Sequence, residues 1–185
     1  MRLLLGVLPL AALGFLAAAL LYLAPRKPGY SHVRHSISEL GETGAPDQQL
    51  VAYGVFLPIG LVFAFVALVL REHAQAAALA ASVAAGYVVA AFFPCDPGSP
   101  MQGSFRQGVH NVGGAVEYVG GGFSLMALSE SLGPILRYGG FVVLVAVAAL
   151  TFLPSGSSVR GLVQRVAECV LFVAIAWVAW VSSAG

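Results

Sequence analysis

Two of the eight acidic residues, Glu117 and Glu168, lie inside long apolar stretches of the sequence. A carboxylate at the centre of a membrane-spanning helix costs on the order of a few kcal/mol, so it requires a partner, a proton or water. Both acids are expected about two helical turns from the same membrane face. Their positions therefore predict a polar site near that face, without revealing its ligand or its reaction.

The stretch around Glu117 places several polar residues on one helical face. Arg106, His110 and Glu117 recur at helical spacing, and Asn111 next to His110 is a further candidate ligand residue. His110 can carry a proton near neutral pH, and a desolvated Glu117 is suited to general acid or base chemistry. Together with Asp96 in the preceding loop, these two residues are catalytic candidates. The alternatives are a Glu117 that only hydrogen-bonds a neighbouring helix and an interfacial His110.

Three arginines each lie near the end of one helical hairpin, namely Arg34, Arg106 and Arg165. A guanidinium group can bind a phosphate through two parallel hydrogen bonds, so these arginines predict a clamp for a lipid phosphate or another anion. Gln164 and Glu168, on the helix that carries Arg165, are candidate ligand contacts as well. The structural alternatives are a local Arg165 to Glu168 ion pair and arginines that extend into water.

The polar segment after the first apolar stretch has a capping signal. Ser36 and Glu39 have the spacing of a capping box, and Gly41 is a suitable helix stop. We therefore expect a short interfacial helix here. Ser38 and Glu39 within it are also catalytic candidates.

Histidines and acids in the polar segments form a candidate metal set. His32, His35, Asp96 and His110, with Cys95 beside Asp96, are suitable ligands for a divalent metal such as zinc. Their spacing is not specific, and no H-E-x-x-H, G-x-S-x-G or phosphate-loop motif supports a named reaction. The sequence leaves open whether the chain holds a metal and whether it is an enzyme.

The elements that must position these residues are membrane-spanning helices. Hydrophobic residues make up 59% of the chain and charged residues 9%, whereas soluble domains contain about a quarter charged residues. A helix needs about 20 apolar residues to cross a membrane. The net charge of +1 provides no basic surface for nucleic acid. We predict an all-α integral membrane bundle of six transmembrane helices in one domain, 1–185, with spans at about 3–24, 49–70, 74–93, 108–129, 134–153 and 162–182.

Six spans place the three odd-numbered connections on one membrane face, and these connections hold nearly all of the polar candidates. Lysine and arginine are also more frequent there, which by the positive-inside rule makes this face cytoplasmic. Several of the arginines are candidate ligand residues, so the orientation stays open. Cys95 and Cys169 fall on the same side, either as a bridge, as shared ligands or as two unconnected thiols.

Several of these segments resemble a known family. The segments Tyr30–Gly41 and Phe93–Pro97, followed by His110 and the pair Gln164-Arg165, resemble the bacterial and archaeal membrane family of unknown function 998 (DUF998). The resemblance covers essentially the whole chain and implies a prokaryotic cell-membrane protein, but that family has no settled activity to carry over.

A shorter stretch has a second, more distant similarity. The segment 37–46 is similar to the loop after the first helix of the Frag1/DRAM-type six-span membrane proteins. That family includes autophagy modulators and a factor that remodels glycosylphosphatidylinositol lipids, so this similarity favours lipid handling. Glu39 stands where those proteins are expected to have an aspartate, and for this reason no catalytic role is transferred.

Three functions follow as hypotheses. The first is a site that binds or processes a lipid headgroup or another phosphate-bearing or anionic ligand, as in an intramembrane lipid hydrolase or transferase. The second is a non-enzymatic proton-coupled transporter or lipid carrier, with Glu117 and Glu168 as a relay. The third is a membrane scaffold whose polar residues only join helices. Membrane lipids are the expected partners, and the oligomeric state stays open.

Overall fold

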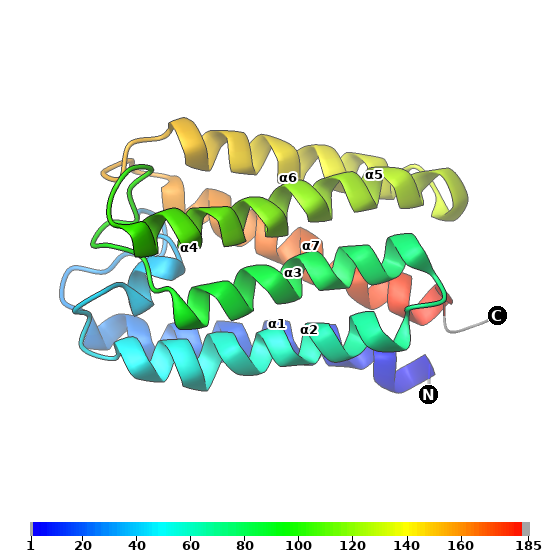
Figure 1. Cartoon of the computed structure of the whole chain (residues 1–185), viewed down its shortest axis with the longest axis horizontal. Coiled ribbons are helices and arrows are strands. Elements are labelled where there is room, and N and C mark those ends of the chain that lie inside the picture. Colours follow the sequence, from blue (N-terminus) through cyan, green and yellow to red (C-terminus); the bar gives the residue numbers. More distant parts are fainter. Residues whose placement is uncertain (1, 183–185) are drawn as a thin grey trace.

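The computed structural model describes residues 2–182, and in this part of the chain all regular structure is helical (Figure 1). The longer helices are α1 (Arg2–Leu23), α2 (Leu57–Val69), α3 (Ala74–Phe92), α4 (Phe105–Ala115), α5 (Gly121–Leu132), α6 (Ile135–Phe152) and α7 (Arg160–Ser182). The shorter ones are the 3-10 helices η1 (Ala24–Arg26) and η2 (Ser38–Gly41) and the π-helices η3 (Leu50–Phe56) and η4 (Val116–Gly120). The predicted all-α class is confirmed.

Two of the rods that cross the bundle are composite. The π-helix η3 continues directly into α2, and α4 continues through η4 into α5, so Phe105–Leu132 forms one unbroken rod. With these joins residues 2–182 form six rods, in agreement with the six expected spans. Five helices are long and apolar enough to cross a membrane, which indicates an integral membrane protein: Leu3–Arg26, Leu50–Val69, Ala74–Phe92, Ile135–Phe152 and Arg160–Ser182.

The sixth rod, which contains the expected span 108–129, is less apolar than the other five. It carries Glu117, several glycines and a polar first turn, so it does not reach their hydropathy. The π-turn at η4 inserts an extra residue into the helical repeat, and such turns often occur at functional sites. Both Glu117 and Tyr118, within η4, are buried.

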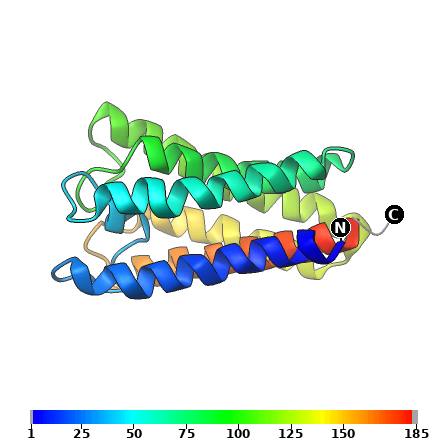
Figure 2. The same ribbon diagram turned by 90° about the horizontal axis from the view of Figure 1, so that it is seen from below.

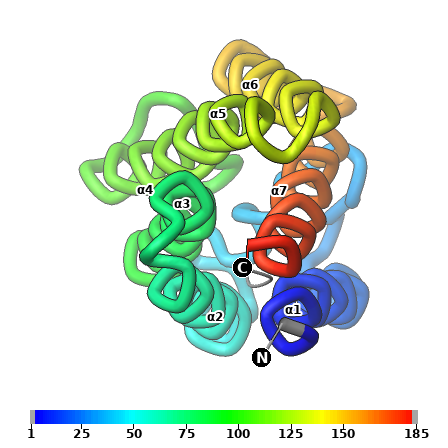
Figure 3. The backbone as a smooth tube through the Cα atoms, turned by 90° about the vertical axis from the view of Figure 1, so that its right-hand side faces the viewer, coloured from blue at the N-terminus to red at the C-terminus, as the bar shows by residue number. Residues whose placement is uncertain are grey.

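The rods form a ring in which neighbours in sequence are mostly neighbours in space. α2 packs on α3, α5 on α6, and α7 on both α6 and α1, while α3 and α7 also meet across the middle (Figure 3). Figure 2 shows α1 lying along α7. This ring brings η4, α3 and α7 together, and these are the elements that carry the buried polar residues.

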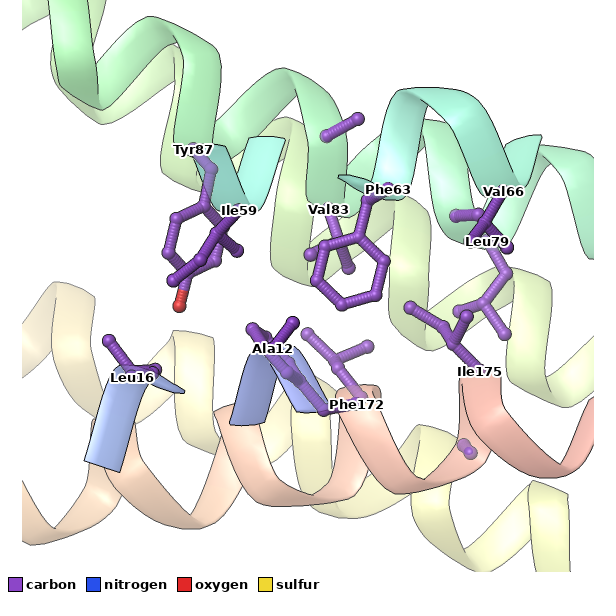
Figure 4. Packing of buried hydrophobic residues seen from close by; sticks show 14 of the residues in the cluster. Ala12, Leu16, Ile59, Phe63, Val66, Leu79, Val83, Tyr87, Phe172 and Ile175 are labelled. Carbon is purple, nitrogen blue, oxygen red and sulfur yellow. The ribbon is translucent and has the colours of Figure 1, made fainter. Parts of the chain in front are cut away.

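The half of the bundle away from the odd-numbered connections is filled with apolar side chains. Phe63 of α2 and Phe172 of α7 meet edge to face, with ring centroids 4.6 Å apart. Leu79 and Val83 of α3 and Ile175 of α7 complete this packing and are almost fully buried (Figure 4). Between membrane-spanning helices such side chains stabilise the bundle by close van der Waals packing, because lipid tails are equally apolar.

The three odd-numbered connections gather at the opposite end, at the left of Figure 1. Backbone hydrogen bonds join them directly: Thr43 N–H donates to Cys95 O at 2.8 Å, and Leu162 N–H donates to Val33 O at 3.0 Å. This end of the bundle is called the loop end below. The loop end holds the polar candidates, as the sequence predicts, whereas its cytoplasmic orientation stays a prediction.

Candidate functional site

A charged pair ties together two of the odd-numbered connections, residues 27–49, called the first connection below, and residues 93–104, called the second connection. Lys27 Nζ lies 2.6 Å from Glu42 Oε1, and the other carboxylate oxygen of Glu42 accepts a hydrogen bond from Gly98 N–H at 2.8 Å. Lys27 also donates to the carbonyl oxygen of Glu39. These contacts hold η2 and the turn at Gly98 against each other at the loop end.

Arg160, the first residue of α7, joins both connections to that helix. Its Nη1 and Nη2 donate to the carbonyl oxygens of Gly98 at 2.9 Å and of Ser99 at 2.6 Å. Gly98 and Ser99 have positive φ angles of 77° and 45°, and this left-handed turn directs both carbonyls to the guanidinium group. Arg160 Nη1 also lies 3.7 Å from Glu39 Oε1, while its Nε has no partner.

The capping box predicted at the first connection is confirmed. Ser36 N–H donates to Glu39 Oε1 at 2.8 Å, and Glu39 N–H donates to Ser36 Oγ at 3.3 Å. The short helix that they begin is a single 3-10 turn that ends at Gly41, where the sequence places its stop. Ser36 and Glu39 are both buried, so this turn is part of the packed site rather than a surface helix.

A hydrogen-bonded cluster lies below this turn, between α3, η4 and α7. Glu168 accepts from Tyr87 Oη at 3.0 Å and from Tyr118 Oη at 2.6 Å. Gln164 Nε2 donates to Tyr118 Oη at 3.1 Å, and its Oε1 accepts from Ile37 N–H at 2.7 Å. The candidates Gln164 and Glu168 therefore lie together as predicted, and both have protein partners.

Glu117 lies next to this cluster in a tight approach between helices. Its carboxyl group is within hydrogen-bonding reach of the carboxyl group of Glu168, yet its Oε1 atom has no partner. Residue 86 of α3 faces it and is a glycine. A Cβ atom on residue 86 would lie 2.6 Å from Glu117 Cβ, closer than side chains pack. Gly86 therefore makes room for the buried acid.

Glu117 and Arg160 line one cavity of about 160 Å³ at the loop end. A smaller adjoining hollow of about 20 Å³ reaches Glu168 and Tyr87. The polar lining of the larger cavity comes from two of the odd-numbered connections, the α4–η4 rod, α6 and α7: Ser36, Ser38, Ser99, His110, Asn111, Glu117, Tyr118, Thr151, Arg160 and Gln164.

The cavity opens between α4 and α6. α5 packs closely along α6, whereas α4 diverges from α6 toward the loop end (Figures 1 and 3). Gly114 and Ala115 of α4 and Val147 and Leu150 of α6 line the cavity at this divergence. Ala115 is exposed, and Val147 and Leu150 are only half-buried. The side wall is therefore apolar and faces outward from the bundle.

His110 and Asn111 contribute to the lining while holding the second connection. His110 Nδ1 lies 2.9 Å from Phe93 O, and a carbonyl oxygen can only accept, so Nδ1 carries the proton and Nε2 of a neutral ring is an acceptor. Asn111 donates to Met101 O at 3.0 Å and accepts from Gln107 Nε2 at 2.7 Å. Both residues thus line the same cavity as Glu117, and for His110 this agrees with the helical spacing.

Asp96 lies outside the cavity lining. Its carboxylate accepts from Ser104 N–H at 2.7 Å and from Ser104 Oγ at 2.8 Å, just before α4 begins. These hydrogen bonds to Ser104 lower the pKa of Asp96 below its ordinary value. Ser104 in turn caps α4 by accepting from Gln107 N–H at 3.2 Å. Asp96 shapes the start of α4 and is not brought to the other catalytic candidates.

The three arginines expected to form a phosphate clamp do not converge. Arg34 and Arg106 are exposed, and neither lines the cavity. Arg165 donates to Tyr30 Oη at 2.7 Å and to His35 O at 3.0 Å, on the side of α7 that faces the first connection. Its guanidinium group is thus engaged by the protein. The positive charge that does line the cavity, among the described residues, is that of Arg160.

The histidines of the first connection pack around Tyr30 instead of forming a metal site. Both His32 and His35 contact the Tyr30 ring, and His32 Nδ1 lies 3.2 Å from Arg165 Nη2. Burial raises the pKa of Tyr30 to about 12, although Arg165 opposes this shift. Burial and Arg165 lower the pKa of His32. Within residues 2–182, the suggested metal candidates do not form a group of three or more His, Cys, Asp or Glu ligands.

The two cysteines are both free thiols. Cys95 is buried and directs its Sγ to Ser38 O at 3.5 Å, whereas Cys169 is exposed on α7. Of the three interpretations that the sequence leaves open, the one with two unconnected thiols agrees with these positions. Burial raises the pKa of the Cys95 thiol to about 12.

Arg160, Tyr87 and Tyr118 belong to the site but were not among the candidates from the sequence. One signal was available for Arg160, because a cation at a helix N-terminus opposes the helix dipole and so requires another reason for its position. The two tyrosines interrupt apolar helices, which is also a sign of a polar partner. Their partner, Glu168, is 50 residues or more away in sequence.

The comparisons with known proteins agree with the family resemblance. No curated protein and no solved structure matches this chain. The distant similarity to the Frag1/DRAM-type proteins stays a prediction. A family model described as "Protein of unknown function (DUF998)" matches residues 9–181, which is nearly the whole chain. The chain therefore belongs to the DUF998 family of membrane proteins.

Proposed function

We propose that this chain, in a prokaryotic cell membrane, binds an amphipathic lipid by its headgroup in the cavity between α4 and α6. The observation that carries the proposal is the combination of a polar interior with a sideways opening. Serine, asparagine, threonine and arginine groups line the interior, while Val147 and Leu150 form the wall at the opening. A lipid entering from the bilayer would meet the apolar wall with its chains and the polar interior with its headgroup.

The size of the cavity supports binding of a headgroup only. Sites that enclose a drug-sized molecule are roughly 300–1,000 Å³, whereas this cavity is about 160 Å³. The acyl chains of a bound lipid would therefore stay outside, along α4 and α6. Two charged residues of the lining, Glu117 and Arg160, each keep one buried polar atom without a partner, which favours a binding site over a scaffold that only joins helices.

Proton-coupled transport is the second candidate, and the contact between Glu117 and Glu168 favours it. A transport path would have to continue to the far face of the membrane. Beyond Glu168 the buried residues of α7 within the described chain are apolar, beginning with Leu171 and Phe172. For this reason we rank lipid binding first. Hydrolysis ranks lower, because in residues 2–182 neither Ser36 nor Ser38 is hydrogen-bonded to His110 as a nucleophile would be.

Two glycines of α4 provide a matched test of lipid binding. A Cβ atom added to Gly114 or to Gly108 would have no atom within 4 Å, so both positions can accept a side chain without a clash. Gly114 lines the cavity, and Gly108 does not. Leucine at position 114 fills the cavity, while leucine at position 108 changes the same helix by the same amount outside it.

The measurement is the thermal stability of the detergent-purified chain with and without added phospholipids. A ligand that binds only the folded state raises the melting temperature. We expect at least one phospholipid class to raise it for the natural chain and for Gly108→Leu, and not for Gly114→Leu. No stabilisation by any phospholipid class, or an equal shift in both variants, would contradict lipid binding in this cavity.

A further inference from the structure

Two residues that line the cavity each carry a buried polar atom that no described protein group pairs. Among the described residues, buried side-chain nitrogen and oxygen atoms without a hydrogen-bond partner occur at two places, Glu117 Oε1 and Arg160 Nε. Both residues are 94% buried, and both line the same cavity. Such atoms are rare in folded proteins, because each costs the solvation that it lost. Both side chains border the space in which a ligand would lie.

The two unpaired atoms require hydrogen-bond partners of opposite kinds. Arg160 Nε is a donor and requires an acceptor, whereas Glu117 Oε1 is an acceptor and requires a donor. Glu117 lies beside Glu168, which follows Arg160 by eight residues on α7, a rise of about 12 Å along the helix. The two unpaired atoms therefore lie toward opposite ends of the cavity, with Glu117 at the deeper end.

The charges also differ between the two ends. Near Arg160, two cations and two acids balance, because Lys27 pairs with Glu42 and Arg160 lies near Glu39. Near Glu117, the neighbouring ionisable partners are Glu168, Tyr87 and Tyr118, together with His110 of the same rod. No lysine or arginine of residues 2–182 pairs with either carboxyl group. The deep end lacks positive charge.

Apart from a proton shared with Glu168, the described residues offer no donor to Glu117 at this end. Tyr87 and Tyr118 each have a single hydroxyl proton, and both protons are directed to Glu168. The His110 proton on Nδ1 is directed to Phe93 O, which leaves Nε2 of the neutral ring as another acceptor. A ligand group that brings both positive charge and N–H donors would complement this end.

We propose that the deep end of the cavity is a subsite for the primary ammonium group of a zwitterionic lipid headgroup, whose phosphate accepts from Arg160 Nε. This inference rests on the proposed lipid-binding function and names the class of headgroup. A primary ammonium has three N–H donors for Glu117 and its neighbours. A quaternary ammonium has none and is recognised by cages of aromatic faces instead. Phosphatidylethanolamine carries the required pair of groups.

The test compares two phospholipids that share acyl chains and phosphate and differ in the amine. The purified full-length chain is titrated with phosphatidylethanolamine and with phosphatidylglycerol, and binding is followed by native mass spectrometry. One charge-assisted hydrogen bond corresponds to a preference of about tenfold for phosphatidylethanolamine. Glu117→Gln should lower this preference, measured as the ratio of the two affinities, to about twofold. The matched control is Glu130→Gln, an exposed acid at the other end of the same rod, which should keep the full preference.

A second measurement needs no variant. A hydrophobic carbodiimide modifies carboxyl groups inside membrane proteins, and peptide mass spectrometry locates the modified residue. Phosphatidylethanolamine should protect Glu117 of the natural chain from the reagent, and phosphatidylglycerol at the same concentration should not. Equal protection by both lipids would overturn the ammonium subsite, even if Glu117→Gln fails to fold.

The outcomes separate the ammonium subsite from the lipid-binding function on which it rests. Equal binding of both lipids that is lost in Gly114→Leu would overturn the ammonium subsite and keep the lipid site. If no lipid binding depended on the cavity, both the ammonium subsite and the lipid-binding function would be overturned. A final experiment repeats the carbodiimide protection measurement with soluble phosphoethanolamine in place of the lipid. Protection of Glu117 at the same concentration as the lipid would support the ammonium subsite and contradict a lipid as its source.

Discussion

Glu117 can be buried because residue 86 of the facing helix has no side chain. Two features of the sequence predict its role, namely its position inside an apolar stretch and its helical spacing from His110. The partner of the acid is not predictable in this way, since Glu168 and Gly86 reach it from two other helices. The same holds for Arg160, whose partners at Gly98 and Ser99 are about 60 residues away in sequence. Local spacing identifies which residues are unusual, and only packing shows what they contact.

Substitution of Gly86 tests this close approach. Gly86→Ala should destabilise the fold by about 1–3 kcal/mol, because the added methyl group overlaps Glu117. Gly108→Ala is the control, since its new methyl group meets open space and alanine favours a helix by up to about 1 kcal/mol. Unfolding in mixed detergent measures both free energies. Equal stability of the two variants would show that residue 86 does not approach the acid.

The buried thiol of Cys95 gives a second prediction at this scale. Its pKa is raised to about 12 by burial, so at pH 8 the residue is a neutral thiol, which is the unreactive form. In a Cys169→Ser chain, a membrane-permeant maleimide should therefore modify Cys95 only after unfolding. The readout is the mass of the intact chain before and after denaturation. Rapid modification of the folded chain would contradict the burial of this residue.

At the scale of elements, α7 is the helix that organises the site. Arg160, Gln164 and Glu168 project from successive turns and contact the turn at Gly98, the first connection and the tyrosines of α3 and η4. The sequence predicts the helices and the capping box, because apolar length and capping residues are local signals. It does not predict the π-turn at η4, which depends on how the rod fits against α3 and α7.

Replacement of Arg160 by lysine tests the link between α7 and the second connection. A lysine ammonium is a point charge and cannot reproduce the planar fork that reaches Gly98 O and Ser99 O together. Arg160→Lys should cost about 1–3 kcal/mol of stability, since buried acceptors lose their donors. It should also increase proteolysis within 94–104.

The control for this variant is Arg106→Lys, because Arg106 is exposed at the same end of the bundle. Exposed substitutions of this kind usually change stability by no more than about 0.5 kcal/mol. If Arg160→Lys and Arg106→Lys had the same stability and the same protease sensitivity, Arg160 would not be holding the second connection.

At the scale of the whole molecule, the bundle has one polar end and one apolar end. The odd-numbered connections, the pairs Lys27–Glu42 and Arg160–Glu39, and the cavity lie at the loop end, while the other half is packed with side chains such as Phe63 and Phe172 (Figure 4). This division agrees with a site that serves one membrane leaflet. The sequence predicts the division from the uneven lengths of the connections, but not the sideways opening, which comes from the divergence of α4 from α6.

Headgroup binding between α4 and α6 is best tested on the lipid that remains bound when the chain is purified from membranes. Native mass spectrometry of the natural chain, of Gly114→Leu and of Gly108→Leu, in one mild detergent, measures the number of phospholipids retained per chain. We expect a retained phospholipid on the natural chain and on Gly108→Leu that is absent from Gly114→Leu. Equal retention by all three chains, or none by the natural chain, would contradict a headgroup site between α4 and α6.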